Sequence, residues 1–223
     1  MVASIYLRKK YANELLEKFK MADCNAVNTP VATGLKLTKD GEGKSVDSTL
    51  FKSLIGSLRY LTITRPDIVY SVGLLSRYME APKESHWLAA KRILRYVKGT
   101  VEFGLFYPYD DEAMLYGYSD SDWGGDQDER KSTTGYVFYL GSTAFTWNSK
   151  KQSVVALSTC EAEYVAASST VCEAIWLRNL LKELKHPQEE STVIYVDNKS
   201  AIELARNPVQ YGRSKHIDTG IIF

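Results

Sequence analysis

Cysteine and histidine are scarce in this chain, and neither is spaced as metal sites or disulfide frameworks require. The 223 residues include three cysteines, an odd number, without a CxxC pair. The three histidines form no HxH or HExxH pattern, and His86 is expected on a helix surface. This spacing argues against a zinc site and against a disulfide-stapled secreted fold.

Long apolar segments and several common catalytic motifs are also missing. No apolar run approaches the 18 residues of a membrane span, and the first ten residues lack the apolar core of a signal peptide. The sequence contains neither a GxSxG nucleophile turn nor a GxxxxGK[ST] phosphate loop. We therefore expect an intracellular protein, cytoplasmic or nuclear, that is not secreted and does not enter a membrane.

Charge is nearly balanced over the whole chain but not along it. The formal net charge is +1, yet residues 1–100 hold 17 Lys and Arg against 9 Asp and Glu, and residues 101–223 hold 11 against 18. A basic half joined to an acidic half suggests a polyanion-binding arm next to a metal-binding site. The alternative, that the two halves merely neutralise each other, remains open on charge grounds.

A change of hydrophobic period divides the chain near the acidic cluster at residues 107–112. We predict a mostly helical segment at 1–108 and an α/β domain with a central mixed sheet at 109–223. The helical patterns of the first part cover residues 10–20, 51–63, 67–82 and 86–97. The second part predicts strands at 114–119, 135–140, 143–148 and 192–196 and helices at 159–184 and 200–206.

Three carboxylates interrupt otherwise apolar stretches of the second part. Asp120 and Asp197 follow strand-like runs, and Glu163 lies near the start of the long helical stretch. A carboxylate in such surroundings needs a compensating positive charge. Three of them on elements that can pack together predict an oxygen-lined pocket for divalent cations, the centre of a nuclease.

Neighbouring acidic residues have structural interpretations. Asp122 precedes Trp-Gly-Gly and is expected in a solvated turn. Glu161 differs from Glu163 by about 200° around a helix and is expected to support the helix start through the helix dipole. For Asp197 the alternative role of a helix N-cap stays open, since Asn198 or Ser200 can also cap that helix.

Exposed basic side chains are candidate contacts to nucleic acid phosphates, although a solvated surface explains them equally well. They are Lys91, Arg92, Arg95, Lys150 and Lys151.

Several long motifs resemble one family. YSDSDWGGD, DERKSTTGYVFYLG, WNSKKQSVVALST, EAEYVAAS, VDNKSAIELARNP and GRSKHID look like the ribonuclease H region of copia-type retrotransposon polyproteins. Residues 9–30, 50–82 and 86–100 look like the C-terminal end of that family's reverse transcriptase. The resemblance covers nearly the whole chain. It implies a ribonuclease H-like mixed sheet with flanking helices, preceded by a thumb- or connection-like helical segment.

The resemblance also implies an activity. Asp120, Glu163 and Asp197 match the first three metal-binding carboxylates of the ribonuclease H fold. The family's site holds two Mg²⁺ (or Mn²⁺) ions and cleaves the RNA strand of RNA–DNA hybrids during reverse transcription. The implied partners are such a hybrid and the remainder of the Pol polyprotein.

Two departures from the family pattern lower the expected activity. The polymerase's Tyr-x-Asp-Asp pair is missing, and the chain stops at Phe223, before the family's last helix, strand and fourth aspartate. Asp218 does not match that aspartate. We therefore expect a truncated product with weak metal binding and slow cleavage. The alternative is a catalytically inactive remnant that keeps the fold or nucleic-acid binding only.

Overall fold

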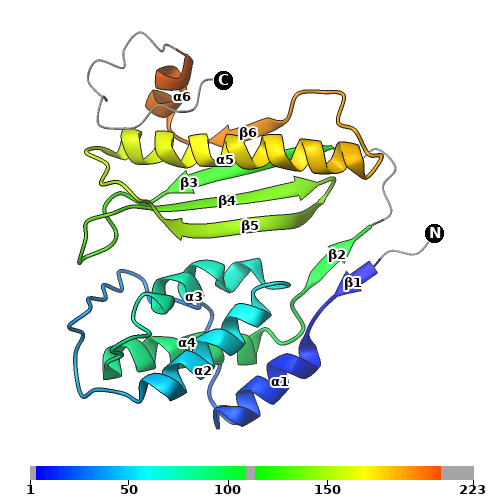
Figure 1. Ribbon diagram of the computed structural model, residues 1–223. Coiled ribbons are helices and arrows are strands. Elements are labelled where there is room, and N and C mark those ends of the chain that lie inside the picture. Colours follow the sequence, from blue (N-terminus) through cyan, green and yellow to red (C-terminus); the bar gives the residue numbers. More distant parts are fainter. Residues whose placement is uncertain (1–3, 109–113, 207–223) are drawn as a thin grey trace. The chain divides into compact units, whose positions relative to one another are not determined.

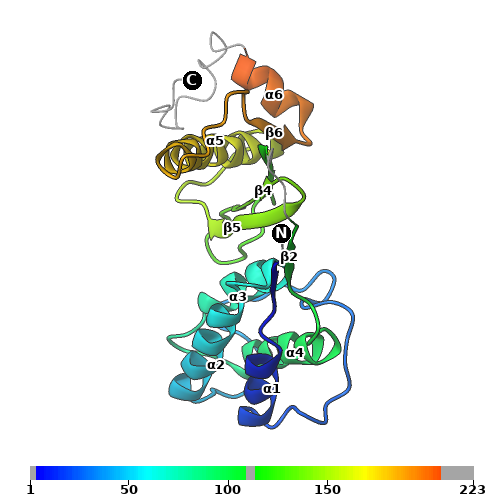
Figure 2. The same ribbon diagram turned by 90° about the vertical axis from the view of Figure 1, so that its right-hand side faces the viewer.

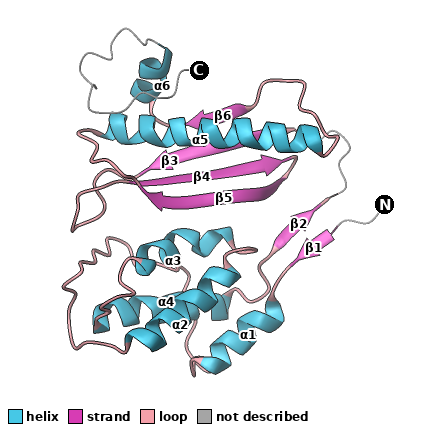
Figure 3. Cartoon of the chain, viewed as in Figure 1, coloured by secondary structure: helices cyan, strands magenta, loops and turns pink. Residues whose placement is uncertain are grey.

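The computed structural model describes residues 4–108 and 114–206, and the chain divides into two compact units, Met1–Tyr109 and Asp110–Phe223. The helices and strands of each unit are distinguished in Figure 3. Helices dominate the first unit, whereas a sheet and one long helix form most of the second (Figure 1). An α/β protein with a mixed sheet, as predicted from the sequence, is confirmed.

The first unit is built from helices whose apolar stripes meet in one core. Its elements are α1 (Lys9–Lys18), α2 (Ser48–Leu61), the 3₁₀ turn η1 (Pro66–Ile68), α3 (Val69–Ser76), α4 (Glu84–Gly99) and the antiparallel strands β1 (Ser4–Tyr6) and β2 (Leu105–Tyr107). Leu16, Phe51, Leu58 and Leu94 are buried in that core. The two strands were not predicted, because three residues are too few to show a strand period.

Helix α3 ends earlier than the sequence predicts. Its last residue is Ser76, because the amides of Arg77 and Tyr78 bond to carbonyls three residues back, at Leu74 and Leu75, in a tighter turn. Tyr78 nevertheless stays buried, and its hydroxyl donates to the Leu37 carbonyl at 3.0 Å. The apolar pattern beyond Ser76 therefore reflects burial without helix.

His86 is buried, so its predicted place on a helix surface was wrong. Its Nδ1 accepts the Lys83 amide at 3.0 Å, its Nε2 lies 2.9 Å from the Thr38 carbonyl, and its ring stacks on Tyr78 at 4.1 Å. Nε2 must carry the proton, because Nδ1 is an acceptor. His86 lies four residues before buried Ala90, at the start of the inner stripe of α4.

The second unit is a four-stranded sheet with the order β5-β4-β3-β6, covered on one face by a long helix (Figures 1 and 2). Strands β3 and β4 and strands β4 and β5 pair antiparallel, whereas β3 and β6 pair parallel. The elements are β3 (Leu115–Ser121), β4 (Thr133–Leu140), β5 (Thr143–Lys151), α5 (Thr159–Glu183), β6 (Val193–Val196) and α6 (Lys199–Arg206).

Strand β3 alternates between the two faces of the sheet. Leu115 belongs to the core beneath α5, and the Ser119 hydroxyl lies 3.0 Å from that of Thr170 on α5. Between them, Gly117 pairs with Phe138, and a Cβ on this glycine would lie 2.7 Å from the phenyl ring. The absence of a side chain at Gly117 thus leaves room for the Phe138 ring in the core between the sheet and α5.

Candidate metal centre

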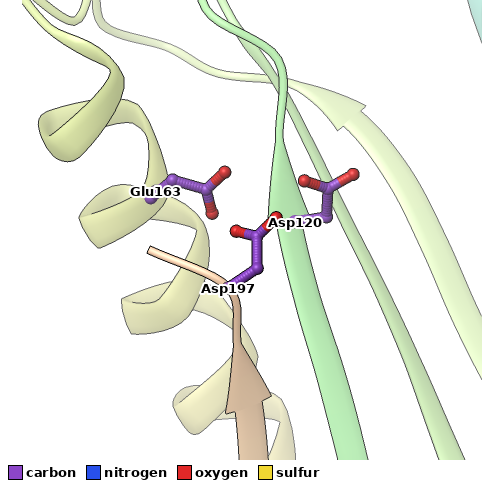
Figure 4. Close-up of side chains that lie close together, drawn as sticks. All are labelled: Asp120, Glu163 and Asp197. Atoms are coloured by element: carbon purple, nitrogen blue, oxygen red, sulfur yellow. The ribbon is translucent and has the colours of Figure 1, made fainter. Parts of the chain in front are cut away.

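Three carboxylates from three elements meet at one end of the sheet. The pairing of Ser119 with Val196 places the next residues side by side: Asp120 in β3 and Asp197 directly after the parallel strand β6. Glu163, in the second turn of α5, points toward them (Figure 4). One oxygen of each carboxylate lies within 4.8 Å of the others. This end of the sheet therefore concentrates up to three negative charges.

Glu163 has the most unusual environment of the three. Its side chain is nearly excluded from water, with 6% of the residue exposed, whereas Asp120 and Asp197 are exposed. Oε1 accepts the Ser121 amide at 3.3 Å, while Oε2 is buried without a hydrogen-bond partner in the part of the chain described. A buried acceptor left unpaired is costly unless another group binds it.

The electrostatics of the cluster disfavour an ionised Glu163. Burial, and to a smaller extent the charges of Asp120 and Asp197, raise the pKa of Glu163 to about 7, against a lowering effect of the Ser121 amide. A divalent cation would favour the ionised form instead. Carboxylate oxygens are the donors that hard cations such as Mg²⁺ bind.

Asp122 and Glu161 have structural roles beside the cluster. Asp122 Oδ1 accepts the Thr133 amide at 2.7 Å and ties the end of β3 to β4, so it is not simply solvated. Glu161 Oε2 accepts the Leu157 amide at 2.7 Å, just before the N-cap Ser158. The predicted support of the helix start by Glu161 is thus present, through a direct hydrogen bond as well as the dipole.

Asn198 caps α6. Its Oδ1 accepts the Ala201 amide at 3.1 Å, which satisfies an amide of the first helical turn. Asp197 is therefore not required as the cap, and its carboxylate is directed toward Asp120 and Glu163 (Figure 4).

Sequence reasoning missed Gln152, which joins the elements under the cluster. Its amide nitrogen lies 3.2 Å from Ser121 Oγ, 3.1 Å from Thr134 Oγ1 and 3.0 Å from the Ala162 carbonyl. The Gln152 residue is 6% exposed. It thereby connects β3, β4 and α5 next to the amide that holds Glu163. The only sequence signal is a lone glutamine after a basic strand end, and many exposed glutamines share that feature.

Replacing Gln152 with leucine is expected to lower the free energy of unfolding by about 1 kcal/mol, because Ser121, Thr134 and Ala162 lose their shared donor, while removal of the unpaired, buried Gln152 Oε1 offsets part of that loss. Urea unfolding followed by tryptophan fluorescence measures the change. Gln127→Leu is the matched control: its amide bonds to Gly125 at the surface, so a change within about 0.5 kcal/mol is expected. Equal effects of the two substitutions would contradict this role for Gln152.

The two lysines at the end of β5 differ in their surroundings. Lys150 is exposed, whereas the Lys151 ammonium lies 3.2 Å from Asp126 and 2.8 Å from Glu129. Hydrogen bonds from Lys151 and Lys131 lower the pKa of Glu129 to about 2. Lys151 therefore anchors the loop between β3 and β4. Phosphate binding by Lys150 and Lys151 stays a prediction.

The other predicted basic contacts lie on α4, in the first unit. Arg92 donates to Thr29 Oγ1 at 2.8 Å, and Arg95 Nε donates to the Asn25 carbonyl at 2.7 Å. The Lys91 ammonium lies over the Trp87 ring, 5.5 Å from its centroid. The arginines thus hold the segment that precedes α2 against α4, and their contact with nucleic acid also stays a prediction.

Comparison with known proteins identifies relatives by sequence only. No protein-family model and no solved structure matches the chain. The chain is 43% identical over 210 residues to "Retrovirus-related Pol polyprotein from transposon RE2" of Arabidopsis thaliana. The matched residues are 94% of this chain and 14% of that relative. The chain is 44% identical over 218 residues to "Retrovirus-related Pol polyprotein from transposon TNT 1-94" of Nicotiana tabacum, covering 95% and 16%.

A shorter relative matches more than half of the chain. "Secreted RxLR effector protein 161" of Plasmopara viticola is 46% identical over 128 residues, which are 57% of this chain and 90% of that protein. With the two transposon proteins, the matches span nearly all of the sequence.

These matches define a retrotransposon-derived protein. The chain belongs to the family of retrovirus-related Pol polyproteins from copia-type transposons, as the sequence motifs predicted. It spans about 14–16% of the length of the Pol polyproteins it matches. Within residues 4–108 and 114–206, no helix has both the length and the apolarity to cross a bilayer.

Proposed function

We propose that the second unit is a ribonuclease H-like domain that hydrolyses the RNA strand of RNA–DNA hybrids with Mg²⁺ or Mn²⁺. One observation carries the proposal. Asp120, Glu163 and Asp197, from β3, α5 and β6, place carboxylate oxygens within 4.8 Å of one another. The unpaired, buried Oε2 of Glu163 supports a bound cation, because a cation would satisfy it.

The three residues would hold the metal ions in different ways. Asp120 and Asp197 are exposed and offer oxygens from the solvent side of the cluster, whereas Glu163 is held from behind by the Ser121 amide. That single hydrogen bond orients the carboxylate and leaves Oε2 available. Bound divalent ions would supply a water of lowered pKa and stabilise the leaving oxygen of the cleaved phosphodiester.

The substrate in this proposal is recognised by shape. Hybrids present ribose 2′-hydroxyls in a wide, shallow groove, so that selection does not require base contacts. Lys150, at the exposed end of β5, is the side chain of the second unit that we propose for phosphate contact. The first unit, with its basic sequence, is proposed as a reverse transcriptase segment that adds affinity for the same hybrid.

A second candidate is a remnant that binds nucleic acid without turnover. It is favoured by the count of carboxylates: the described residues bring three acidic side chains together, whereas the family's site uses four. If these three carboxylates alone hold the ions, one of two ions would be held loosely and the cleavage rate would be low.

Incubation of the full chain with a labelled RNA–DNA hybrid and millimolar Mg²⁺ separates the two candidates. Hydrolysis of the RNA strand that Asp120→Asn abolishes supports the nuclease, because the substitution removes a charged oxygen with little change of shape. Hybrid binding without cleavage supports the remnant. Cleavage that persists in Asp120→Asn would contradict the assignment of the site and indicate a contaminating nuclease.

A further inference from the structure

A second candidate binding site lies in the first unit. A cavity of about 530 Å³ opens between residues 32–42 and helix α4. Its helical wall is one stripe of α4, formed by Ser85, Leu88, Ala89 and Arg92 at positions i, i+3, i+4 and i+7. The volume is typical of sites for small molecules.

Hydrogen bonds hold the irregular wall of the cavity against the helix. The amide of Glu42 donates to Ser85 Oγ at 3.0 Å, and the amide of Ser85 donates to the Glu42 carbonyl at 3.1 Å. Further along, the Thr38 carbonyl contacts His86, and the Leu37 carbonyl accepts the hydroxyl of Tyr78. The cavity is thus preformed, which lowers the entropic cost of filling it.

The polar groups of the cavity are unevenly distributed. Lys36, Arg92 and Arg95 contribute three positive charges to its lining against one carboxylate, Glu42. Arg92 Nε is buried and has no hydrogen-bond partner among the described residues. A buried guanidinium N–H without an acceptor is costly, and an anion in the cavity would remove that cost.

Part of the lining is apolar. Leu35 and Ala89 line the cavity, and Leu88 is 59% exposed. An inorganic anion alone would leave these side chains uncovered. A ligand that fits has an anionic group, an apolar body and hydroxyl or amino donors for Glu42.

We propose that this cavity binds a nucleoside phosphate, either free or as one unit of a single strand. The phosphate lies on Arg92 and Arg95, whose guanidinium groups match its geometry. The base or sugar covers Leu88, and Glu42 accepts from a sugar hydroxyl or a base amino group. The site is independent of the carboxylate cluster and of the nuclease proposal.

Calorimetric titration of the full chain with adenosine monophosphate, inorganic phosphate and a short single-stranded oligoriboadenylate tests the proposal. Leu88→Glu introduces a negative charge that repels the phosphate of the ligand. Because Leu88 is exposed, the substitution leaves the fold intact. We expect it and Arg92→Gln to weaken adenosine monophosphate binding about tenfold or more. Lys91→Gln is the control, because Lys91 lies over Trp87 and does not line the cavity; its affinity should stay within about twofold.

Each result decides the question. Binding of adenosine monophosphate or of the oligoriboadenylate with this variant pattern supports the proposal, and the tighter of the two identifies the source of the nucleotide. Equal affinity for inorganic phosphate would show that the apolar wall is not used and would overturn it. Equal losses in Lys91→Gln and Arg92→Gln would indicate general attraction to the helix. Such equal losses would overturn the proposal. An unchanged affinity of Leu88→Glu for adenosine monophosphate, or no binding at millimolar ligand, would also overturn the proposal.

Discussion

Glu163→Gln is expected to lower the affinity of the chain for Mn²⁺ by more than about 100-fold, since losing a group that merely orients a ligand already costs about 10- to 100-fold. The substitution removes the charge while keeping the size and the bond from the Ser121 amide. Its two neighbours in the cluster are exposed aspartates, which share the ion with water. Calorimetry or Mn²⁺ electron paramagnetic resonance with the full chain measures the loss.

Glu161→Gln is the matched control for that experiment. Glu161 is buried two residues earlier on the same helix, but its carboxylate accepts the Leu157 amide, and it is not among the three clustered acids. Mn²⁺ affinity should therefore change little. If Glu161→Gln weakened binding as much as Glu163→Gln, the loss would reflect a disturbed helix start, and the assignment of Glu163 as a ligand would fail.

The carboxylate cluster could be predicted from the sequence because its members lie at positions that strand ends and the helix period define. Asp120 and Asp197 each follow a strand-like run, and the parallel pairing of those runs brings equivalent positions together. Glu163 lies on the same helical line as Thr170, Ala174 and Leu177, which the structure buries against the sheet. Strand and helix periods are short-range properties, so one sequence reveals them.

Other features depend on contacts between distant residues and could not be predicted. His86 is buried because residues 37–42 fold back over the start of α4. That segment is irregular, so no hydrophobic period in the sequence predicts its position. Gln152 lies among partners on β3, β4 and α5, which only the finished sheet brings together. Arg65 is likewise buried. It bonds to nearby Asp67 and to Thr100, and Thr100 lies 35 residues further along the chain.

In the absence of divalent cations, the free energy of unfolding is expected to fall as the pH rises from 4.5 toward 7. Over that range the unfolded chain has lost the Glu163 proton while the folded chain retains it, so folding binds a proton and is disfavoured at higher pH. With about 1.4 kcal/mol for each pH unit, the loss from this residue is at most about 3.5 kcal/mol and is complete above pH 7.

Urea unfolding of the parent chain and of Glu163→Gln at several pH values isolates this contribution, because every other titrating group is common to both proteins. The parent should become progressively less stable than the variant from pH 4.5 to 7, and millimolar Mg²⁺ above pH 7 should restore the parent alone, since only it binds the ion well. The ionised, buried Glu163 would then be a group whose cost to stability is offset by the cation it binds. Parallel pH profiles of the two proteins would show that the pKa of Glu163 is the same in the folded and unfolded chains and would remove the argument that its burial favours a bound metal.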